Sequence, residues 1–229
     1  MAFRSPLGDK EAVKLARLLV ANRRLQYLRF YKGDFSADGI SALAGALQTQ
    51  NRVLEMQLWE NQKVNPSSLA LLLSCQSLKT LSLHHNCIDE HGALVLATAL
   101  PASNVSQLYL GNNEIGDNGL VHLAKCINSC KYLTSLGLSS NNIGDRGVVE
   151  LSAALHKNIT LRSLYLAWNL ISSSGAQALL DALDFNKVLS QLLLSGNGKI
   201  DTELIYVLGE AIKVPRRRIR QTKDQQEHC

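Results

Sequence analysis

The chain contains 229 residues, of which 46% are hydrophobic and 19% are charged, and its formal net charge is +5. The mean hydropathy is −0.01, and no run approaches the roughly 18 apolar residues of a membrane span, so we expect a soluble globular chain. The five cysteines are an odd number and fit no disulfide framework, which excludes a small secreted domain held together by disulfides.

The first predicted element is an amphipathic helix over residues 8–22, and Ser5 followed by Pro6 is a typical helix start. This segment matches the helix of the repeat described below but lacks the strand that should precede it. We therefore assign residues 1–24 to an N-terminal half-repeat, which either caps the fold or continues a longer array of repeats. The outer side of its helix carries three basic residues: Lys10, Lys14 and Arg17.

A motif of eleven or twelve residues recurs along the rest of the chain. Its clearest copy, residues 133–143 (LTSLGLSSNNI), reads L-x-x-L-x-L-x-x-N-x-I. Seven copies begin 25 to 28 residues apart, at Leu25, Val53, Leu78, Val105, Leu133, Leu161 and Leu189. This period and consensus predict a solenoid of seven strand–helix units over residues 25–213.

Each unit divides into a strand and a helix. Alternating leucines at positions 4 and 6 of the motif favour a short strand, and the following Gly and Leu or Ala residues, as in residues 119–127, have helical spacing. Position 9 is asparagine in six units: Asn61, Asn86, Asn113, Asn141, Asn169 and Asn197. An amide both donates and accepts, so we interpret these residues as a structural column at the strand end rather than as a polar binding row.

The motif and its period resemble the ribonuclease-inhibitor-like class of leucine-rich repeats, which includes the repeat domains of NOD-like receptors and the Ran GTPase-activating protein. The resemblance covers roughly residues 8–212. It implies an α/β fold, a right-handed solenoid or horseshoe with parallel strands on the concave face and helices on the convex face. It also implies a domain that binds proteins with the concave face, since few members are enzymes.

In such a fold, positions 3, 5, 7 and 8 of each motif point out of the concave sheet. Both tryptophans and four of the six tyrosines fall at these positions. The predicted partner-binding residues are Tyr27, Arg29, Tyr31, Lys32, Trp59, Glu60, His84, His85, Tyr109, Tyr165 and Trp168. Trp, Tyr and Arg dominate binding hot spots, although aromatic residues on a sheet also support one another across strands.

Mutual packing should explain Tyr109 and Tyr165 less well than a partner does, because Gly137 separates them at the same motif position. We expect Gly137, Ser139 and Ser140 to form a shallow dip between aromatic rims. A protruding element of a protein partner would fit such a dip.

Other candidate sites are weaker. His84 and His85 alone make a poor metal site, and His122, Cys126 and Cys130 share one helical face, where packing is the more common role. The sequence has no Gly-x-Ser-x-Gly elbow and no phosphate-binding loop, so we expect no catalytic residue, cofactor or metal.

The last predicted helix spans residues 202–213 and is stopped by Pro215. From Lys213 onward six basic residues face two acidic ones, a net of +4, which leaves about +1 of the total +5 for the rest. We therefore assign residues 214–229 to a basic, disordered, solubilising tail and expect no nucleic acid on the repeat body. Arg216, Arg217 and Arg218 could alternatively form a nuclear localisation signal or contact an anionic surface.

These patterns favour a monomeric, non-enzymatic module for protein–protein interaction. No secretory signal precedes it, so we expect the cytoplasm, with the nucleus as the alternative. Two further functions stay open: a GTPase activator of the Ran-activator type that uses Arg29, the single concave arginine, and a detached sensing domain of a NOD-like receptor or a bacterial effector.

Overall fold

A computed structural model describes residues 2–3, 7–22, 24–49, 52–61 and 64–213. Over these residues strands and helices alternate, which confirms the predicted α/β solenoid. The first half comprises β1 (Ala2–Phe3), α1 (Asp9–Ala21), β2 (Tyr27–Tyr31), α2 (Ala37–Thr49), β3 (Glu55–Trp59), α3 (Pro66–Leu73), β4 (Thr80–Ser82) and α4 (Glu90–Ala99), followed by a short 3-10 turn, Leu100–Ala102. The second half comprises β5 (Gln107–Tyr109), α5 (Gly116–Cys126), β6 (Ser135–Gly137), α6 (Asp145–Leu155), β7 (Ser163–Tyr165), α7 (Ser173–Phe185), β8 (Gln191–Leu193) and α8 (Thr202–Lys213).

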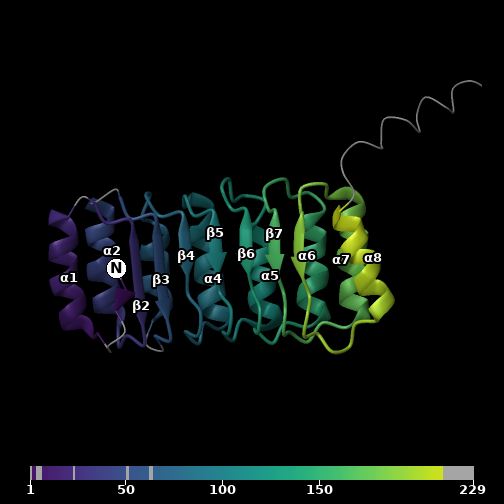
Figure 1. Cartoon of the computed structure of the whole chain (residues 1–229), viewed down its shortest axis with the longest axis horizontal. Coiled ribbons are helices and arrows are strands. Elements are labelled where there is room, and N and C mark those ends of the chain that lie inside the picture. Colours follow the sequence, from purple (N-terminus) through teal and green to yellow (C-terminus); the bar gives the residue numbers. More distant parts are fainter. Residues whose placement is uncertain (1, 4–6, 23, 50–51, 62–63, 214–229) are drawn as a thin grey trace, which may run out of the picture.

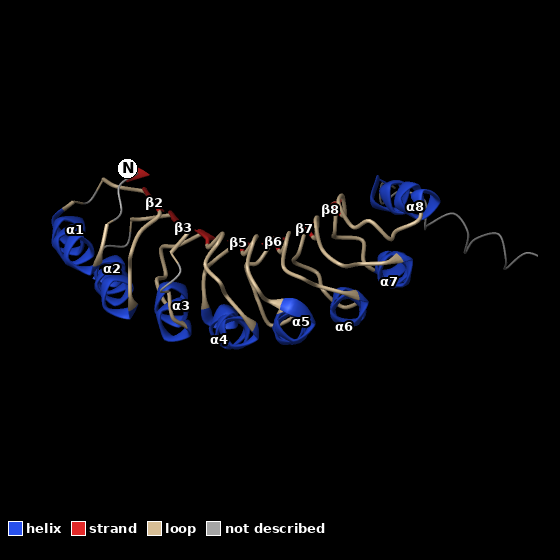
Figure 2. Cartoon of the chain, turned by 90° about the horizontal axis from the view of Figure 1, so that it is seen from below, coloured by secondary structure: helices blue, strands red, loops and turns tan. Residues whose placement is uncertain are grey.

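The strands form one parallel sheet in chain order, β1 to β8 (Figure 1). Figure 2 shows the strands on the inner side of a shallow arc and helices α1 to α7 in a row on its outer side. Helix α8 leaves this row and lies at the end of the sheet. Neither wall is buried by one unit alone, so each unit depends on its neighbours for a core.

The core follows directly from the motif. Position 4 pairs with position 4 of the next unit throughout, as in Leu108, Leu136 and Leu164. These three leucines are 0% exposed. The helices contribute the opposing apolar layer with residues such as Leu123 and Leu151, which are equally buried. A period of one strand and one helix therefore places the same side chains in the same environment in every unit.

The N-terminal half-repeat differs from the prediction. Its strand is present, because Ala2 pairs with Arg29 and Phe3 with Phe30 in the parallel sheet, so the expectation of a missing strand is wrong. The strand is only two residues long and lacks the leucines of the motif, which is why the sequence pattern missed it. Helix α1 begins at Asp9 with Gly8 as its N-cap, later than expected, and Ser5 and Pro6 lie outside the described residues.

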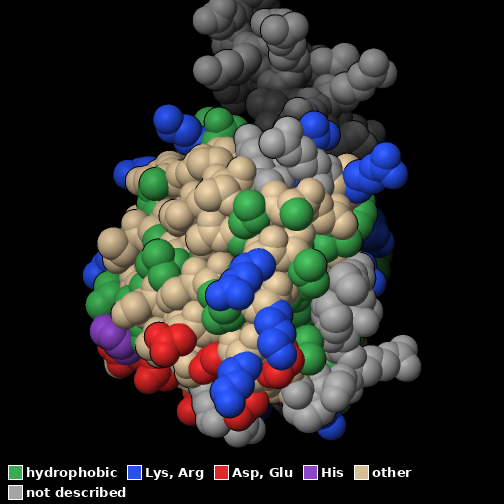
Figure 3. All heavy atoms as spheres, turned by 90° about the vertical axis from the view of Figure 1, so that its left-hand side faces the viewer, with side chains coloured by type: hydrophobic (Ala, Val, Ile, Leu, Met, Phe, Trp, Pro, Cys, Tyr) green, Lys and Arg blue, Asp and Glu red, His purple; other side chains and the backbone are tan. Residues whose placement is uncertain are grey.

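The surface of the N-terminal end is mixed in charge. Lys10, Lys14 and Arg17 are exposed on α1, as predicted. Seen from this end, acidic side chains lie close to several of the basic ones (Figure 3).

At the other end, α8 has the predicted bounds, Thr202–Lys213. Pro215 and the basic tail of residues 214–229, including Arg216 to Arg218, lie outside the described residues. Among the helices that the structure describes, none combines the length and the apolar character needed to cross a membrane.

The six motif asparagines form a buried column that joins each unit to its neighbours; each is at most 6% exposed. The Oδ1 atom of Asn169 accepts the backbone N–H groups of Asn141 and Ile143, at 2.9 and 3.1 Å. Its Nδ2 atom donates to the carbonyls of Leu138 and Leu166, at 2.9 and 3.1 Å. The side chain thereby satisfies backbone groups that the turn after the strand leaves unpaired.

A second set of contacts between units was not visible in the sequence. The carboxylate of Asp145, in the first turn of α6, accepts the backbone N–H groups of Ser172 and Gly175 at the start of α7, at 2.8 and 3.1 Å, and the Ser172 hydroxyl at 2.5 Å. Burial alone would raise the pKa of Asp145, but these hydrogen bonds and the charge of Lys199 outweigh it and lower the pKa. One helix thus supplies the N-terminal cap of the next.

Candidate protein-binding face

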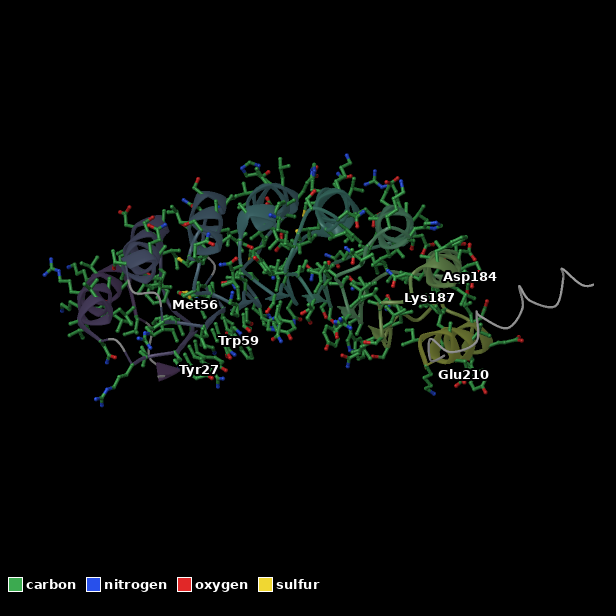
Figure 4. All side chains as sticks on the ribbon, turned by 90° about the horizontal axis from the view of Figure 1, so that it is seen from above. Tyr27, Met56, Trp59, Asp184, Lys187 and Glu210 are labelled. Atoms are coloured by element: carbon green, nitrogen blue, oxygen red, sulfur yellow. The ribbon has the colours of Figure 1, made fainter. Side chains whose placement is uncertain are left out.

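The concave side of the sheet carries a continuous row of aromatic rings. We call this row the aromatic ladder; it consists of Tyr31, Trp59, His84, Tyr109 and Tyr165. Successive ring centroids are 5.0, 5.2, 6.3 and 6.3 Å apart. Figure 4 shows Trp59 and Tyr27 on the concave side of the sheet, whereas Met56 points toward the helices.

The ladder runs obliquely across the units. Its first three members occupy motif position 7 of β2, β3 and the turn after β4, whereas Tyr109 and Tyr165 occupy position 5 of β5 and β7. Trp59 donates from Nε1 to the hydroxyl of Ser82 at 2.8 Å. Because the members occupy two different motif positions, the motif alone did not predict one continuous row.

Tyr109 and Tyr165 touch across the intervening strand, so the expectation that mutual packing explains them poorly is wrong. Gly137 makes the contact possible, because a Cβ atom at this residue would lie 2.8 Å from Cδ1 of Tyr109. The ring therefore occupies the space that a side chain on β6 would fill. Glycine connects the two tyrosines rather than separating them.

A depression of about 210 Å³ lies within the ladder. Its rims are the rings of His84, Tyr109 and Tyr165, and its floor includes Gly111, Gly137 and Ser139. It lies where the sequence predicted a dip, but Ser140 does not line it. A rigid, glycine-floored hollow with ring walls is suited to one inserted side chain.

His84 forms one wall of this hollow. Its Nδ1 atom is buried and makes no hydrogen bond in the structure, and it would lie 2.9 Å from a Cβ atom placed on Gly111. Burial lowers the pKa of His84, the backbone of Gly111 opposes this effect, and the charge of His85 lowers the pKa further. The ring is therefore held neutral at a pH where an exposed histidine begins to charge.

This shift predicts a pH dependence of stability. Above the ordinary histidine pKa, His84 is neutral in both states and has no effect. As the pH falls below that value, the unfolded chain takes up the proton first, so the free energy of unfolding decreases until the folded protein also protonates. Urea unfolding at pH 7.5 and 5.5 measures this decrease. The free energy of unfolding should fall less between these pH values in His84→Phe, which keeps a ring in the ladder, than in the native protein. An equal loss in both proteins would refute the assignment, since all other titrating groups are shared.

The charged members of the predicted site form ion pairs: Lys32 with Glu60, also a predicted residue, and Arg29 with Glu55, which was not predicted. The Arg29 guanidinium lies 3.1 Å from the Glu55 carboxylate, and Lys32 Nζ lies 3.6 Å from Glu60. Arg29 lies on strand β2, and its side chain is 46% exposed.

Position 8 of the motif lies just beyond the end of each strand, on a rim beside the aromatic ladder. Its residues adopt left-handed backbone conformations, with φ between 53° and 56° at Lys32, Glu60, His85 and Trp168. Trp168 is therefore not part of the ladder, and its ring lies against Gly196, where a Cβ atom would approach it to 2.5 Å. Among the predicted tyrosines and tryptophans, Tyr27 and Trp168 are the ones that stay open to solvent, at 48% and 70% exposure.

The structure does not assemble the metal sites that the sequence left open. Cys126 and Cys130 are buried, with their sulfur atoms 4.0 Å apart. A hydrogen bond from Cys130 lowers the pKa of the Cys126 thiol. His122 instead approaches Glu90, at 3.7 Å. Within the described part of the chain, no three His, Cys, Asp or Glu side chains gather in a way that could hold a metal ion.

Comparisons with known proteins agree with this geometry. A family model described as "Leucine Rich repeat" matches residues 74–97, 102–124, 129–152 and 157–180. A solved structure of actin-binding site 2 of leiomodin-1 is similar, with a TM-score of 0.51 and 16% identity, covering 83% of this chain and 96% of that one. The C-terminal domain of tropomodulin from Caenorhabditis elegans gives a TM-score of 0.49 and 12% identity, covering 82% of this chain and 99% of that one. The comparison with curated proteins found no match. At 16% identity, the leiomodin-1 structure shows a shared fold alone.

Proposed function

This chain is a leucine-rich repeat protein, and we propose that it is a non-enzymatic interaction module that binds a protein partner through its concave face. The observation that carries the proposal is the aromatic ladder with its glycine-floored depression. Aromatic side chains provide large contact areas at a low cost in conformational entropy, which is why they dominate hot spots.

The ladder is ordered before any partner arrives. Its rings are held by neighbouring rings and by close contact with Gly137 and Ser82. A partner therefore meets side chains that have already lost much of their rotamer freedom, which lowers the entropic cost of association.

Actin is one defined protein to test. The leiomodin-1 structure is titled as an actin-binding site, and at 16% identity it supplies a candidate rather than an assignment. We also propose a cytoplasmic location, with the nucleus as the alternative, because the five cysteines fit no disulfide framework.

The test compares matched substitutions on the two walls. The concave variant is Tyr109→Glu with Tyr165→Glu. The convex control is Leu94→Glu with Val149→Glu, at residues of α4 and α6 that are 40% and 48% exposed. Circular dichroism first establishes that both variants are folded.

Purified actin and cell lysate are then passed over each immobilised protein. We expect a partner bound by the native chain and the convex control to lose at least about tenfold in affinity with the concave variant. Binding that survives in the concave variant and disappears in the convex control would place the interaction on the helices instead.

A further inference from the structure

One unit places two large apolar side chains on the rim that borders the concave face. The rim consists of motif positions 8 and 10, which lie just beyond each strand. The fourth unit places Asn112 and Glu114 there and the fifth places Ser140 and Asn142, whereas the sixth unit carries Trp168 and Leu170. Because the other units show what the fold requires at these positions, the apolar pair is not a demand of the repeat.

Folding does not account for this pair either. Trp168 is 70% exposed and Leu170 is 65% exposed, so neither contributes much to the core. Trp168 also has φ 56°, the left-handed conformation that motif position 8 adopts in the other units too, and the rim residue of the next unit is Gly196. Large exposed apolar side chains that lie together are typical of a binding site.

A groove adjoins this pair. It measures about 400 Å³ and is lined by Asn169, Leu170, Ile171, Gly196, Gly198 and Lys199. The two glycines leave it open, and Lys199 is the single charged residue among those described as lining it. The groove thus combines apolar walls with one ammonium group at the edge.

We propose that this rim groove binds an apolar side chain of the protein partner, with a carboxylate near that side chain in the partner sequence meeting Lys199. The inference rests on the proposed function, because Trp168 lies three residues after Tyr165 of the aromatic ladder and a partner on the concave face reaches both. The occupant is a short segment in which Leu, Ile, Val or Phe is closely followed by Asp or Glu. Charge complementarity with Lys199 selects the acidic flank.

The experiment uses a library of random dodecapeptides displayed on phage and selected on the full chain. The comparison protein is Trp168→Ser with Leu170→Asn, which installs the residues that the fifth unit carries at Ser140 and Asn142. Both new side chains already occur at the same motif positions in the fifth unit, so we expect the variant to fold. Selected peptides are then synthesised and titrated against a Trp59→Phe protein, so that Trp168 is the single fluorescent tryptophan.

We expect enriched peptides to share an apolar residue followed within two positions by Asp or Glu. Their affinity should fall at least tenfold in the Trp168→Ser, Leu170→Asn protein and several-fold in Lys199→Gln. The inference is overturned if no peptide distinguishes the native chain from the rim variant, or if the enriched flanks are basic.

Two further outcomes separate this inference from the proposed function. Peptides or partners that require Tyr109 and Tyr165 but bind the rim variant normally would leave the concave face in place and overturn the rim groove. A dimer of the native chain in sedimentation that dissociates in the rim variant would assign the patch to a second copy and also overturn the inference.

Discussion

Replacing Asn169 with alanine is expected to lower the free energy of unfolding by about 3 kcal/mol or more, since each buried polar group left without a partner costs about 1–3 kcal/mol. The side chain is 6% exposed and accepts the N–H groups of Asn141 and Ile143. It also donates to the carbonyls of Leu138 and Leu166. Truncation removes these four bonds and a fifth, to the carbonyl of Ala167 at 3.3 Å, at the boundary between two units, where little water can replace them.

Urea unfolding measures this loss, with Asn128→Ala as the matched control. Asn128 is exposed and makes one side-chain hydrogen bond, at 3.2 Å to the carbonyl of Ala154, so its replacement should cost no more than about 1 kcal/mol. If the two variants were equally stable, the asparagine column would not be the structural device that its contacts indicate.

The second large effect concerns the approach of neighbouring helices. A Cβ atom on Gly175 would lie 2.5 Å from Oδ1 of Asp145, 3.0 Å from Cγ2 of Ile171 and 3.3 Å from the Cα atom of Asp145. Gly175→Ala should therefore push away the carboxylate that caps α7 and cost about 1–3 kcal/mol, as overpacking in a tight interior usually does.

Gly45→Ala is the opposite case within the same fold. Gly45 lies in α2 with no atom within 4 Å of its Cβ position, so alanine should stabilise the helix by about 0.5–1 kcal/mol. Thermal unfolding of the two variants should shift the midpoint in opposite directions. A gain in stability at both residues would show that the contact between Asp145 and α7 does not constrain the packing of α6 and α7.

The motif predicted the features that recur in every unit, but it did not predict the short first strand or the contacts between neighbouring units. The asparagine positions, the inward leucines and helix α8 all follow from local spacing. The strand Ala2–Phe3 was missed because two residues carry no period. The cap from Asp145 to Ser172 joins residues that are 27 positions apart, and no pattern within one unit reveals such a contact.

The sequence predicted which side chains lie on the concave surface, but it did not predict which of them contact one another. Motif positions identified the concave side chains, whereas the contact between Tyr109 and Tyr165 depends on how far two rings reach over Gly137. Motif positions 7 and 8 looked equivalent in the sequence, but the left-handed backbone at Trp168 separates the rim from the ladder. Hydrophobic periodicity does not reveal the sign of the backbone angle φ at a single residue.

Photo-crosslinking tests most directly whether the concave face binds the protein partner. The photoreactive residue p-benzoylphenylalanine replaces Tyr109 in one protein and Val149, on the convex helix α6, in another. Both proteins are irradiated in the same cell lysate. Our account predicts a crosslinked partner from residue 109 that is absent from residue 149 and that native protein competes away. A partner crosslinked from residue 149 but not from residue 109 would contradict it.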